Sequence, residues 1–205
     1  AVSSGTVMKG FYYINVGATI EAINIQNSFI HDIVCDGGDL FDCRKGYIKS
    51  LNINNNVIYN CATERDFIRY DDASNSFGNP IPEINITQNT IDNCMNDANG
   101  KRILYVRFNG KKGGQRITVA NNLITNTKAV YTNQATTSTP EYRNNYYFNC
   151  NNANIFAASD KDNSLYWNGD VSGKNGDNPN YQNPAKGQFT VMNKDISKLK
   201  VGAQR

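Results

Sequence analysis

The sequence predicts an all-β protein, a right-handed parallel β-helix in which short strands stack coil upon coil. An eleven-residue pattern recurs five times along the 205 residues. Each copy alternates apolar and polar residues on both sides of an Asn-rich centre, which is typical of two short strands joined at a corner. Asn and Gly are abundant and only 19% of the residues are charged, a composition that disfavours helices and favours turns.

The five copies are separated by segments of unequal length. They read INIQNSFIHDI from Ile23, LNINNNVIYNC from Leu51, INITQNTIDNC from Ile84, ITVANNLITNT from Ile117 and PEYRNNYYFNC from Pro140. A fixed motif with variable spacing indicates constant coils with variable loops, as in solenoid proteins. We therefore expect about five coils.

The motif also predicts which residues face the interior. Its first, third and eighth positions are apolar and are expected to point inward. The corner between them is expected at the fifth position, which is Asn or Gln in every copy. Asn tolerates the left-handed backbone that a sharp bend requires. Its amide can also bond to the Asn of the next coil, which predicts an Asn ladder along the stack.

A third short strand is expected after each motif copy, in the segments DLFDCRK, DFIRYDD, ILYVRFN, AVYTN and IFAAS. Parallel pairing of three strands per coil completes the β-helix, and the crossover rule predicts its right-handedness. Aligned on their apolar residues, these segments give one inward column of Phe41, Ile68, Val106, Val130 and Phe156. The next inward column is Cys43, Tyr70, Phe108, Thr132 and Ala158.

The chain is expected to form one domain. Residues 1–174 would be the coils, and residues 175–205, where the motif is lost, an irregular C-terminal cap over the last open sheet edge. The first coil has no evident cap. We therefore expect this chain to be part of a larger polypeptide or to pack against a partner at its N-terminal coil.

Composition and motifs exclude several functions. The formal charge of +3 is too small to indicate a nucleic-acid binder, and no run of eighteen apolar residues indicates a transmembrane segment. Cys61, Cys94 and Cys150 share the eleventh motif position, which favours free thiols in a column over a disulfide framework. With one His and no CxxC, no metal site or cofactor is expected. Carboxylates near Asp71 leave calcium open as an alternative that no motif supports.

The candidate ligand-binding residues lie on the outward face of the third strands. Two successive strands present an aromatic residue beside an arginine, Phe67 with Arg69 and Tyr105 with Arg107. Aromatic rings stack on sugars, and guanidinium groups bind carboxylate or sulfate with two hydrogen bonds. The predicted ligand-binding set is Arg44, Phe67, Arg69, Asp71, Tyr105 and Arg107.

Two alternatives to this site stay open. Arg69 could instead pair with Asp42 and Asp71 in a solvated ladder that relieves stacked like charge. No Ser–His–Asp or Cys–His pair can be assembled, so catalytic residues are not assigned. An enzyme would have to abstract a proton beside a uronate carboxylate, with Lys101 or Arg107 as the base.

Three segments of the sequence carry a family resemblance. The repeat INxxNNxIxNC, the segment RDFIRYDD after FDCRKGYIKSLNINNN, and the tail NPAKGQFTVMNKDISKLKVG resemble secreted, surface-associated β-helix proteins of gut Bacteroidetes. Those proteins carry domains of unknown function and are distantly similar to the chondroitinase B and alginate lyase family. The resemblance implies a right-handed β-helix, a secreted or cell-surface location and a role around acidic polysaccharides. In the lyase family a Lys and an Arg act beside a calcium ion, and no motif here fixes those positions.

We therefore expect a cell-surface or secreted β-helix module that binds acidic polysaccharide. The first alternative is a polysaccharide lyase that cleaves uronate-containing glycans by β-elimination. The second is a structural or adhesive stalk. The fold alone does not choose among them, because the same coil can host unrelated functions.

Overall fold

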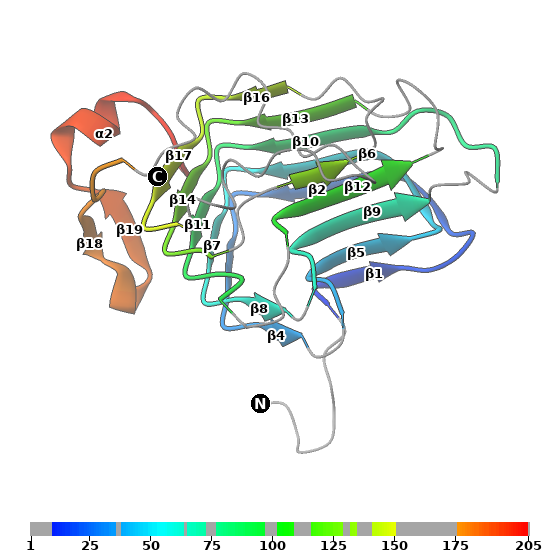
Figure 1. The fold of residues 1–205 in the computed structure, drawn as a ribbon, viewed down its shortest axis with the longest axis horizontal. Helices are drawn as coiled ribbons and strands as arrows, with labels where there is room; N and C mark the ends of the chain where they lie inside the picture. Colours follow the sequence, from blue (N-terminus) through cyan, green and yellow to red (C-terminus); the bar gives the residue numbers. More distant parts are fainter. Residues whose placement is uncertain are drawn as a thin grey trace, which may run out of the picture.

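The computed structural model describes residues 10–35, 38–63, 65–72, 77–96, 102–108, 116–128, 132–134, 141–150 and 176–204. These residues form three five-stranded parallel sheets that surround a common core (Figure 1). The predicted fold class, a right-handed parallel β-helix with three strands per coil, is confirmed. No helix in the described part of the chain is long and apolar enough to cross a membrane.

The three large sheets are named A, B and C here, and each complete coil contributes one strand to each of them. Sheet A contains β1 (Tyr12–Ile14), β5 (Phe41–Arg44), β9 (Ile68–Asp72), β12 (Leu104–Phe108) and β15 (Thr132–Gln134). Sheet B contains β2 (Thr19–Gln26), β6 (Tyr47–Asn54), β10 (Glu83–Thr87), β13 (Arg116–Ala120) and β16 (Glu141–Arg143). Sheet C contains β3 (Phe29–His31), β7 (Val57–Tyr59), β11 (Thr90–Asp92), β14 (Leu123–Thr125) and β17 (Tyr146–Phe148). A small fourth sheet pairs β4 (Val34–Cys35) with β8 (Ala62–Thr63).

Each coil passes through sheets B, C and A in that order. Four coils are complete within the described residues, from β2 to β15, and β16 and β17 begin a fifth. The third strand predicted for that fifth coil, around Phe156 and Ala158, lies outside the described residues, as does Val130 of the fourth.

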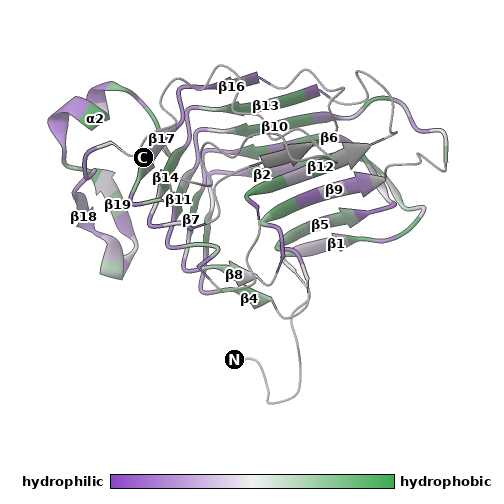
Figure 2. Cartoon of the chain, viewed as in Figure 1, coloured by the Kyte–Doolittle hydropathy of each residue, from purple (hydrophilic) through white to green (hydrophobic). Residues whose placement is uncertain are grey.

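The chain turns into and out of sheet C at two columns of residues whose backbone conformation is left-handed. The fifth motif position has φ between 51° and 60° in all five copies, and the tenth between 48° and 54°. Asn, Asp and Gln occupy these positions, and Asn and Asp tolerate this backbone better than other L-residues. Hydrophilic residues accordingly mark the corners beside sheet C, while apolar residues follow the strands (Figure 2).

The predicted Asn ladder exists, and its buried part runs inside a corner. The sixth motif position holds Asn56, Asn89, Asn122 and Asn145, which are at most 1% exposed. Each amide reaches back to the preceding coil. Asn89 Nδ2 donates to the Ile53 carbonyl at 2.8 Å, and Asn89 Oδ1 accepts from the Asn56 backbone N–H at 3.1 Å. The ladder therefore satisfies backbone groups that the corner leaves without strand partners.

The interior column of thiols is also present. All five cysteines are free and buried, including Cys61, Cys94 and Cys150 of the eleventh motif position. They act as small apolar side chains of the core.

The register of sheet A differs from the prediction after β9. Ile68 pairs with Leu104 instead of Val106, and Val106 pairs with Tyr70 and Gln134. Side chains alternate with a period of two along a strand, so a shift by two residues leaves every side chain on its predicted face. The apolar pattern of this strand fits both registers equally well. The two inward columns predicted for sheet A are therefore wrong beyond the second coil.

Residues 176–204 lie mainly along the side of the stack. They contain β18 (Tyr181–Asn183), the 3₁₀-helix η1 (Pro184–Lys186), β19 (Gln188–Val191) and α2 (Lys194–Lys198). Figure 1 places these elements beside the strands of sheet C. We call residues 176–204 the flank module. Its first residues meet the last strand of sheet C, where the Gly176 N–H donates to the Tyr147 carbonyl of β17 at 2.8 Å, and the rest of the irregular C-terminal segment extends along the outer face of that sheet.

The flank module packs on the outer face of sheet C. Leu123 of β14 forms a small apolar cluster with Ile196 and Val201, and the Tyr59 and Phe189 rings lie 5.0 Å apart. The last described residues run back across the coils, and the Gly202 N–H donates to the Asn121 carbonyl at 2.8 Å. This module closes an apolar face that water would otherwise contact.

Candidate functional site

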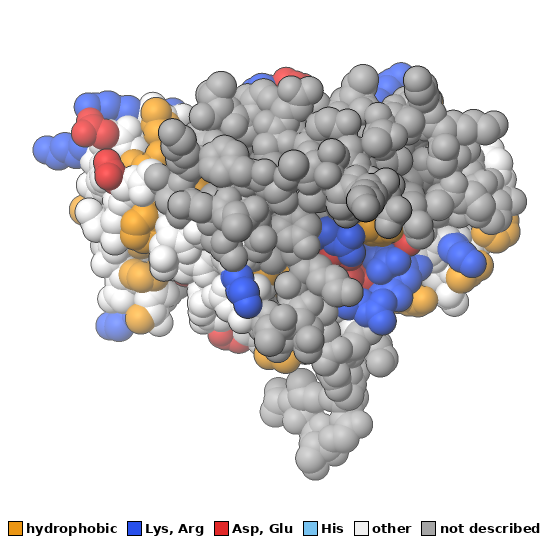
Figure 3. Space-filling model, in the orientation of Figure 1, with side chains coloured by type: hydrophobic (Ala, Val, Ile, Leu, Met, Phe, Trp, Pro, Cys, Tyr) orange, Lys and Arg blue, Asp and Glu red, His pale blue; other side chains and the backbone are white. Residues whose placement is uncertain are grey.

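Four of the six predicted ligand-binding residues come together on sheet A. They are Arg44, Arg69, Asp71 and Tyr105. Arg69 Nη2 donates to Asp71 Oδ2 at 2.7 Å, and the Tyr105 ring lies under two guanidinium groups, those of Arg69 at 5.0 Å and Arg102 at 4.1 Å. Figure 3 shows basic side chains gathered on this face with acidic ones between them.

These arginines already form ion pairs with buried carboxylates. Arg44 is bound to Asp39 and Asp42, and Arg102 holds Asp66 through two hydrogen bonds of 2.6 and 3.1 Å. Asp39, Asp42 and Asp66 are at most 2% exposed. Arg69 pairs with Asp71, as the alternative interpretation predicted, but in a buried cluster rather than a solvated ladder, and Asp42 pairs with Arg44. This cluster has little positive charge left for an anionic ligand.

Phe67 is not an exposed aromatic residue. It is fully buried, and its ring meets the Phe41 ring edge to face at 5.5 Å. Leu40, its counterpart one coil earlier, is fully buried as well. Both residues precede a strand at a bend, so the alternation of the strand does not extend to them. Phe67 therefore exposes no ring face on which a sugar could stack, and its predicted role in sugar binding is wrong.

Arg107 does not share a column with Arg69. Its backbone pairs with Asp71, while Arg69 pairs with Tyr105. The Arg107 side chain and Lys101, the two bases considered for an enzyme, lie outside what the structure describes. Among the described residues, no group of three His, Cys, Asp or Glu side chains is placed to hold a metal ion.

The Asp42 carboxyl should make stability depend on pH. Burial, and then the nearby Asp39 carboxylate, raise the pKa of Asp42 to about 6, although Arg44 and Arg69 oppose this. A carboxyl whose pKa is raised by folding stabilises the folded state in its protonated form. The free energy of unfolding should therefore fall, relative to that of Asp42→Asn, as pH rises from about 4 to about 6.

Denaturant unfolding of both proteins across that range measures this difference. Above about pH 7, where Asp42 is ionised in both states, the difference between the two proteins should become constant. Two curves that stay parallel from pH 4 to pH 6 would contradict it.

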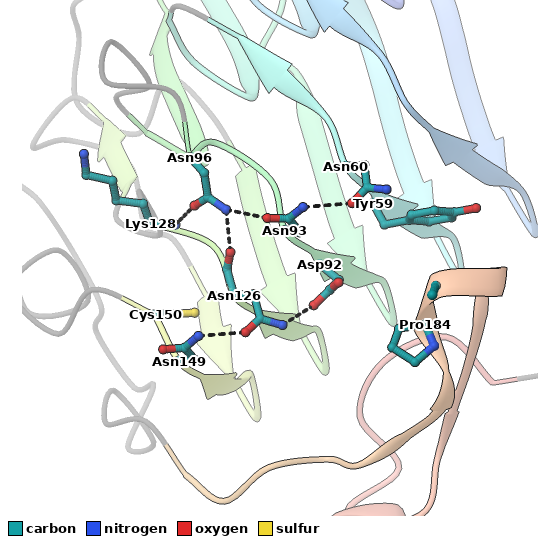
Figure 4. Close-up of a pocket in the computed structure, with 11 residues that line it drawn as sticks. Tyr59, Asn60, Asp92, Asn93, Asn96, Asn126, Lys128, Asn149, Cys150 and Pro184 are labelled. Carbon is teal, nitrogen blue, oxygen red and sulfur yellow. Dashed lines mark hydrogen bonds between the residues drawn. The ribbon is translucent and has the colours of Figure 1, made fainter.

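A second site lies on the other side of the molecule, where the chain leaves sheet C. A groove of about 730 Å³ runs between this corner of the coils and η1 of the flank module (Figure 4). Pro184 and Ala185 form one wall. The opposite wall consists of the tenth-position residues Asn60, Asn93, Asn126 and Asn149, one from each of four successive coils.

The amides of this wall are linked along the stack. Asn93 Nδ2 donates to Asn60 Oδ1 at 2.9 Å, and Asn149 Nδ2 donates to Asn126 Oδ1 at 2.8 Å. Asn96 bridges the two pairs, because its Nδ2 donates to Asn93 Oδ1 and to the Asn126 carbonyl, both at 2.8 Å. The left-handed backbone of the corner holds each amide in place.

Two charged residues line the groove as well. Asp92 is largely buried, and its Oδ1 accepts from Thr125 Oγ1 at 2.6 Å and from Asn126 Nδ2 at 2.7 Å. Burial raises the pKa of the Asp92 carboxyl, and these two hydrogen bonds partly offset the effect. Lys128 lies at the opposite end of the groove from Tyr59 and is exposed (Figure 4).

Comparison with known families covers most of the chain. A domain of unknown function (DUF5123) matches residues 84–205, more than half of the chain. The chain belongs to the DUF5123 family. A second domain of unknown function (DUF4957) matches residues 5–61. No curated protein and no solved structure matches.

The DUF5123 match spans both walls of the groove. It contains Asn93, Asn126 and Asn149 of the coil wall and Pro184 and Ala185 of the flank module. The sheet A cluster is divided instead, since Asp39 and Arg44 fall in the DUF4957 match. The groove is thus largely a feature of the DUF5123 part of the chain.

Sequence reasoning missed the groove and half of the ion cluster. Asn at the tenth motif position in four of five copies was a visible signal for the amide wall. Nothing in the pattern predicted that the flank module would supply a second wall. A charged residue lies two positions before each of the strands β5, β9 and β12. These residues are Asp39, Asp66 and Arg102, and their recurrence was a signal for the cluster.

Proposed function

We propose that this protein binds polysaccharide chains, of the acidic class predicted from the sequence, and that the groove beside the flank module is the binding site. One observation carries the proposal. Amide side chains from four successive coils line one wall of an open groove.

Amides suit sugar recognition because hydroxyl groups both donate and accept hydrogen bonds. A primary amide offers two donors and an oxygen with two lone pairs. Asn60, Asn93 and Asn149 each donate one hydrogen bond through Nδ2 along the ladder. Each of these groove-lining amides has a second Nδ2 hydrogen that a sugar hydroxyl could accept. Successive coils are about 4.8 Å apart, so four amides extend over roughly 14 Å. An extended oligosaccharide can therefore follow the ladder.

Lys128 favours this groove over sheet A for an acidic chain. The sheet A arginines are committed to buried carboxylates. In the groove, Asp92 can accept from sugar hydroxyls, and Lys128 supplies a positive charge that an acidic sugar would approach. A secreted or cell-surface location, and the resemblance to secreted Bacteroidetes β-helix proteins, belong to the same proposal.

The proposal is tested by screening the purified protein on a glycan array and titrating the best oligosaccharide by calorimetry. Ala185 is exposed and forms part of the flank-module wall. Ala185→Trp should fill the groove and weaken binding at least about tenfold, a loss of about 1.4 kcal/mol. Lys194→Trp, on α2 of the same module, serves as the matched control and should bind like wild type.

Three outcomes would overturn parts of the proposal. No binding to any glycan would overturn the function. Unchanged binding by Ala185→Trp would overturn the site. Release of unsaturated uronate, measured by its ultraviolet absorbance on pectate, alginate and chondroitin, would replace binding by lyase activity.

A further inference from the structure

One buried carboxylate differs from the others in its partners. Five aspartates are buried in the described part of the chain, Asp39, Asp42, Asp66, Asp71 and Asp92. The first four each form an ion pair with an arginine. Asp92 has no Lys or Arg partner in the same part of the chain, and its hydrogen bonds come from neutral groups, the Thr125 hydroxyl and the Asn126 amide. A buried charge without a counter-charge is costly, which indicates a role beyond packing.

The second oxygen of the Asp92 carboxyl is available to a ligand. Thr125 and Asn126 both donate to Oδ1, so Oδ2 accepts from no group among the residues that the structure describes. Asp92 lines the groove between the coils and η1, towards Pro184, and Lys128 lies at the far end (Figure 4). These two are the charged residues of the groove lining. The groove is therefore negative beside the flank module and positive at the Lys128 end.

Given the polysaccharide groove proposed above, on which this inference rests, we infer that Asp92 selects a neutral sugar beside Pro184. The ligand is then a heteropolysaccharide in which neutral sugars adjoin an acidic one, rather than a chain made of uronates alone. A carboxylate accepts from sugar hydroxyls in short, charge-assisted hydrogen bonds. It repels the carboxylate of a uronate at the same place, whereas Lys128 attracts one at the other end.

The repulsion is large enough to set specificity. Two carboxylates about 6 Å apart weaken binding about threefold even in bulk water. Asp92 is only 7% exposed, so salt and water screen its charge less than they would on an open surface. The same burial raises the pKa of the Asp92 carboxyl. A uronate placed beside Asp92 is therefore disfavoured at least about threefold relative to a neutral sugar.

Calorimetric titration with two kinds of oligosaccharide tests this selection. One kind is uronate throughout, namely tetragalacturonate and tetramannuronate. The mixed kind is xylotriose with one glucuronate on its terminal sugar, and tetragalacturonate methyl-esterified on all but its terminal sugar. EDTA is present, so that no divalent cation bridges two carboxylates. The wild-type protein should bind the mixed kind at least about threefold more tightly.

Asp92→Asn should abolish this preference. Asparagine keeps an oxygen that can accept from Thr125 and Asn126, so the variant should fold and unfold like wild type. It should bind the uronate kind at least about threefold more tightly than wild type does, because the repulsion is removed. Lys128→Gln should instead weaken binding of the mixed kind about threefold, because the terminal uronate loses its counter-charge.

Asp195→Asn is the matched control, since it removes the same charge from an exposed position on α2 of the flank module. It should keep the wild-type preference. An unchanged preference in Asp92→Asn would overturn the selection, as would equal weakening of both kinds together with a lower unfolding midpoint, which is the result expected if Asp92 only holds Thr125 and Asn126. Failure to bind either kind would also overturn it, while the proposed function is decided separately on the glycan array.

Discussion

Replacing Asn89 by alanine is expected to lower the free energy of unfolding by about 2–6 kcal/mol, because two buried backbone groups lose their partners at about 1–3 kcal/mol each. Asn89 is fully buried. Its amide holds the Asn56 N–H and the Ile53 carbonyl, and it is also bonded to Asn122 Oδ1 at 3.0 Å. Alanine fills none of these roles and leaves a small cavity. Equilibrium denaturation in urea measures the loss.

Asn85→Ala provides the control for this effect. Asn85 belongs to the same coil, and its Nδ2 donates to Asn52 on the outer surface at 2.9 Å. Water can replace that bond, so the variant should lose no more than about 1 kcal/mol. Equal losses for Asn85→Ala and Asn89→Ala would mean that the buried ladder does not hold the corners together.

The second large effect is expected from Arg102→Ala on sheet A. Arg102 forms a two-point ion pair with Asp66, a fully buried carboxylate. Removing one partner of a buried pair leaves an uncompensated charge and typically costs about 3–5 kcal/mol. Loss of the cation–π contact with Tyr105 adds to this cost. Thermal and urea unfolding at neutral pH should show a large destabilisation.

Arg143→Ala is the matched control, because Arg143 pairs with Glu141 through the same Nε atom on an exposed surface. Exposed ion pairs contribute at most about 1 kcal/mol, so this variant should remain close to wild type. The Arg102→Ala defect should also shrink at acidic pH, where Asp66 takes up a proton. A pH-independent defect would contradict the buried-charge explanation.

The fold was predictable because the motif encodes it in single residues. Ile58 and Ile91 at the eighth position point inward, and Asn55 and Asn121 at the fifth have the left-handed backbone that the corner needs. These requirements are local, so each copy of the motif carries the same inward apolar residues and the same corner amides. The stacking of coils follows, since one coil alone cannot bury its apolar face.

The site was less predictable for three physical reasons. Register in sheet A is ambiguous by two residues, because Leu104 and Val106 both satisfy an alternating pattern. Burial of Phe67 depends on a bend before its strand, which alternation does not report. The placement of the flank module depends on tertiary packing against Leu123. The seventh motif position was a signal for this packing, because Val57 and Leu123 point outward and are nevertheless apolar.

Nuclear magnetic resonance of the asparagine side-chain amides tests the proposed binding site most directly. On titration with an oligosaccharide that binds, the NH₂ signals of Asn60, Asn93 and Asn149 in the groove should shift. Those of Asn24 and Asn85 on the outer face of sheet B should stay in place. Shifts at the Nε–H signals of the sheet A arginines, with the groove amides unmoved, would contradict the account.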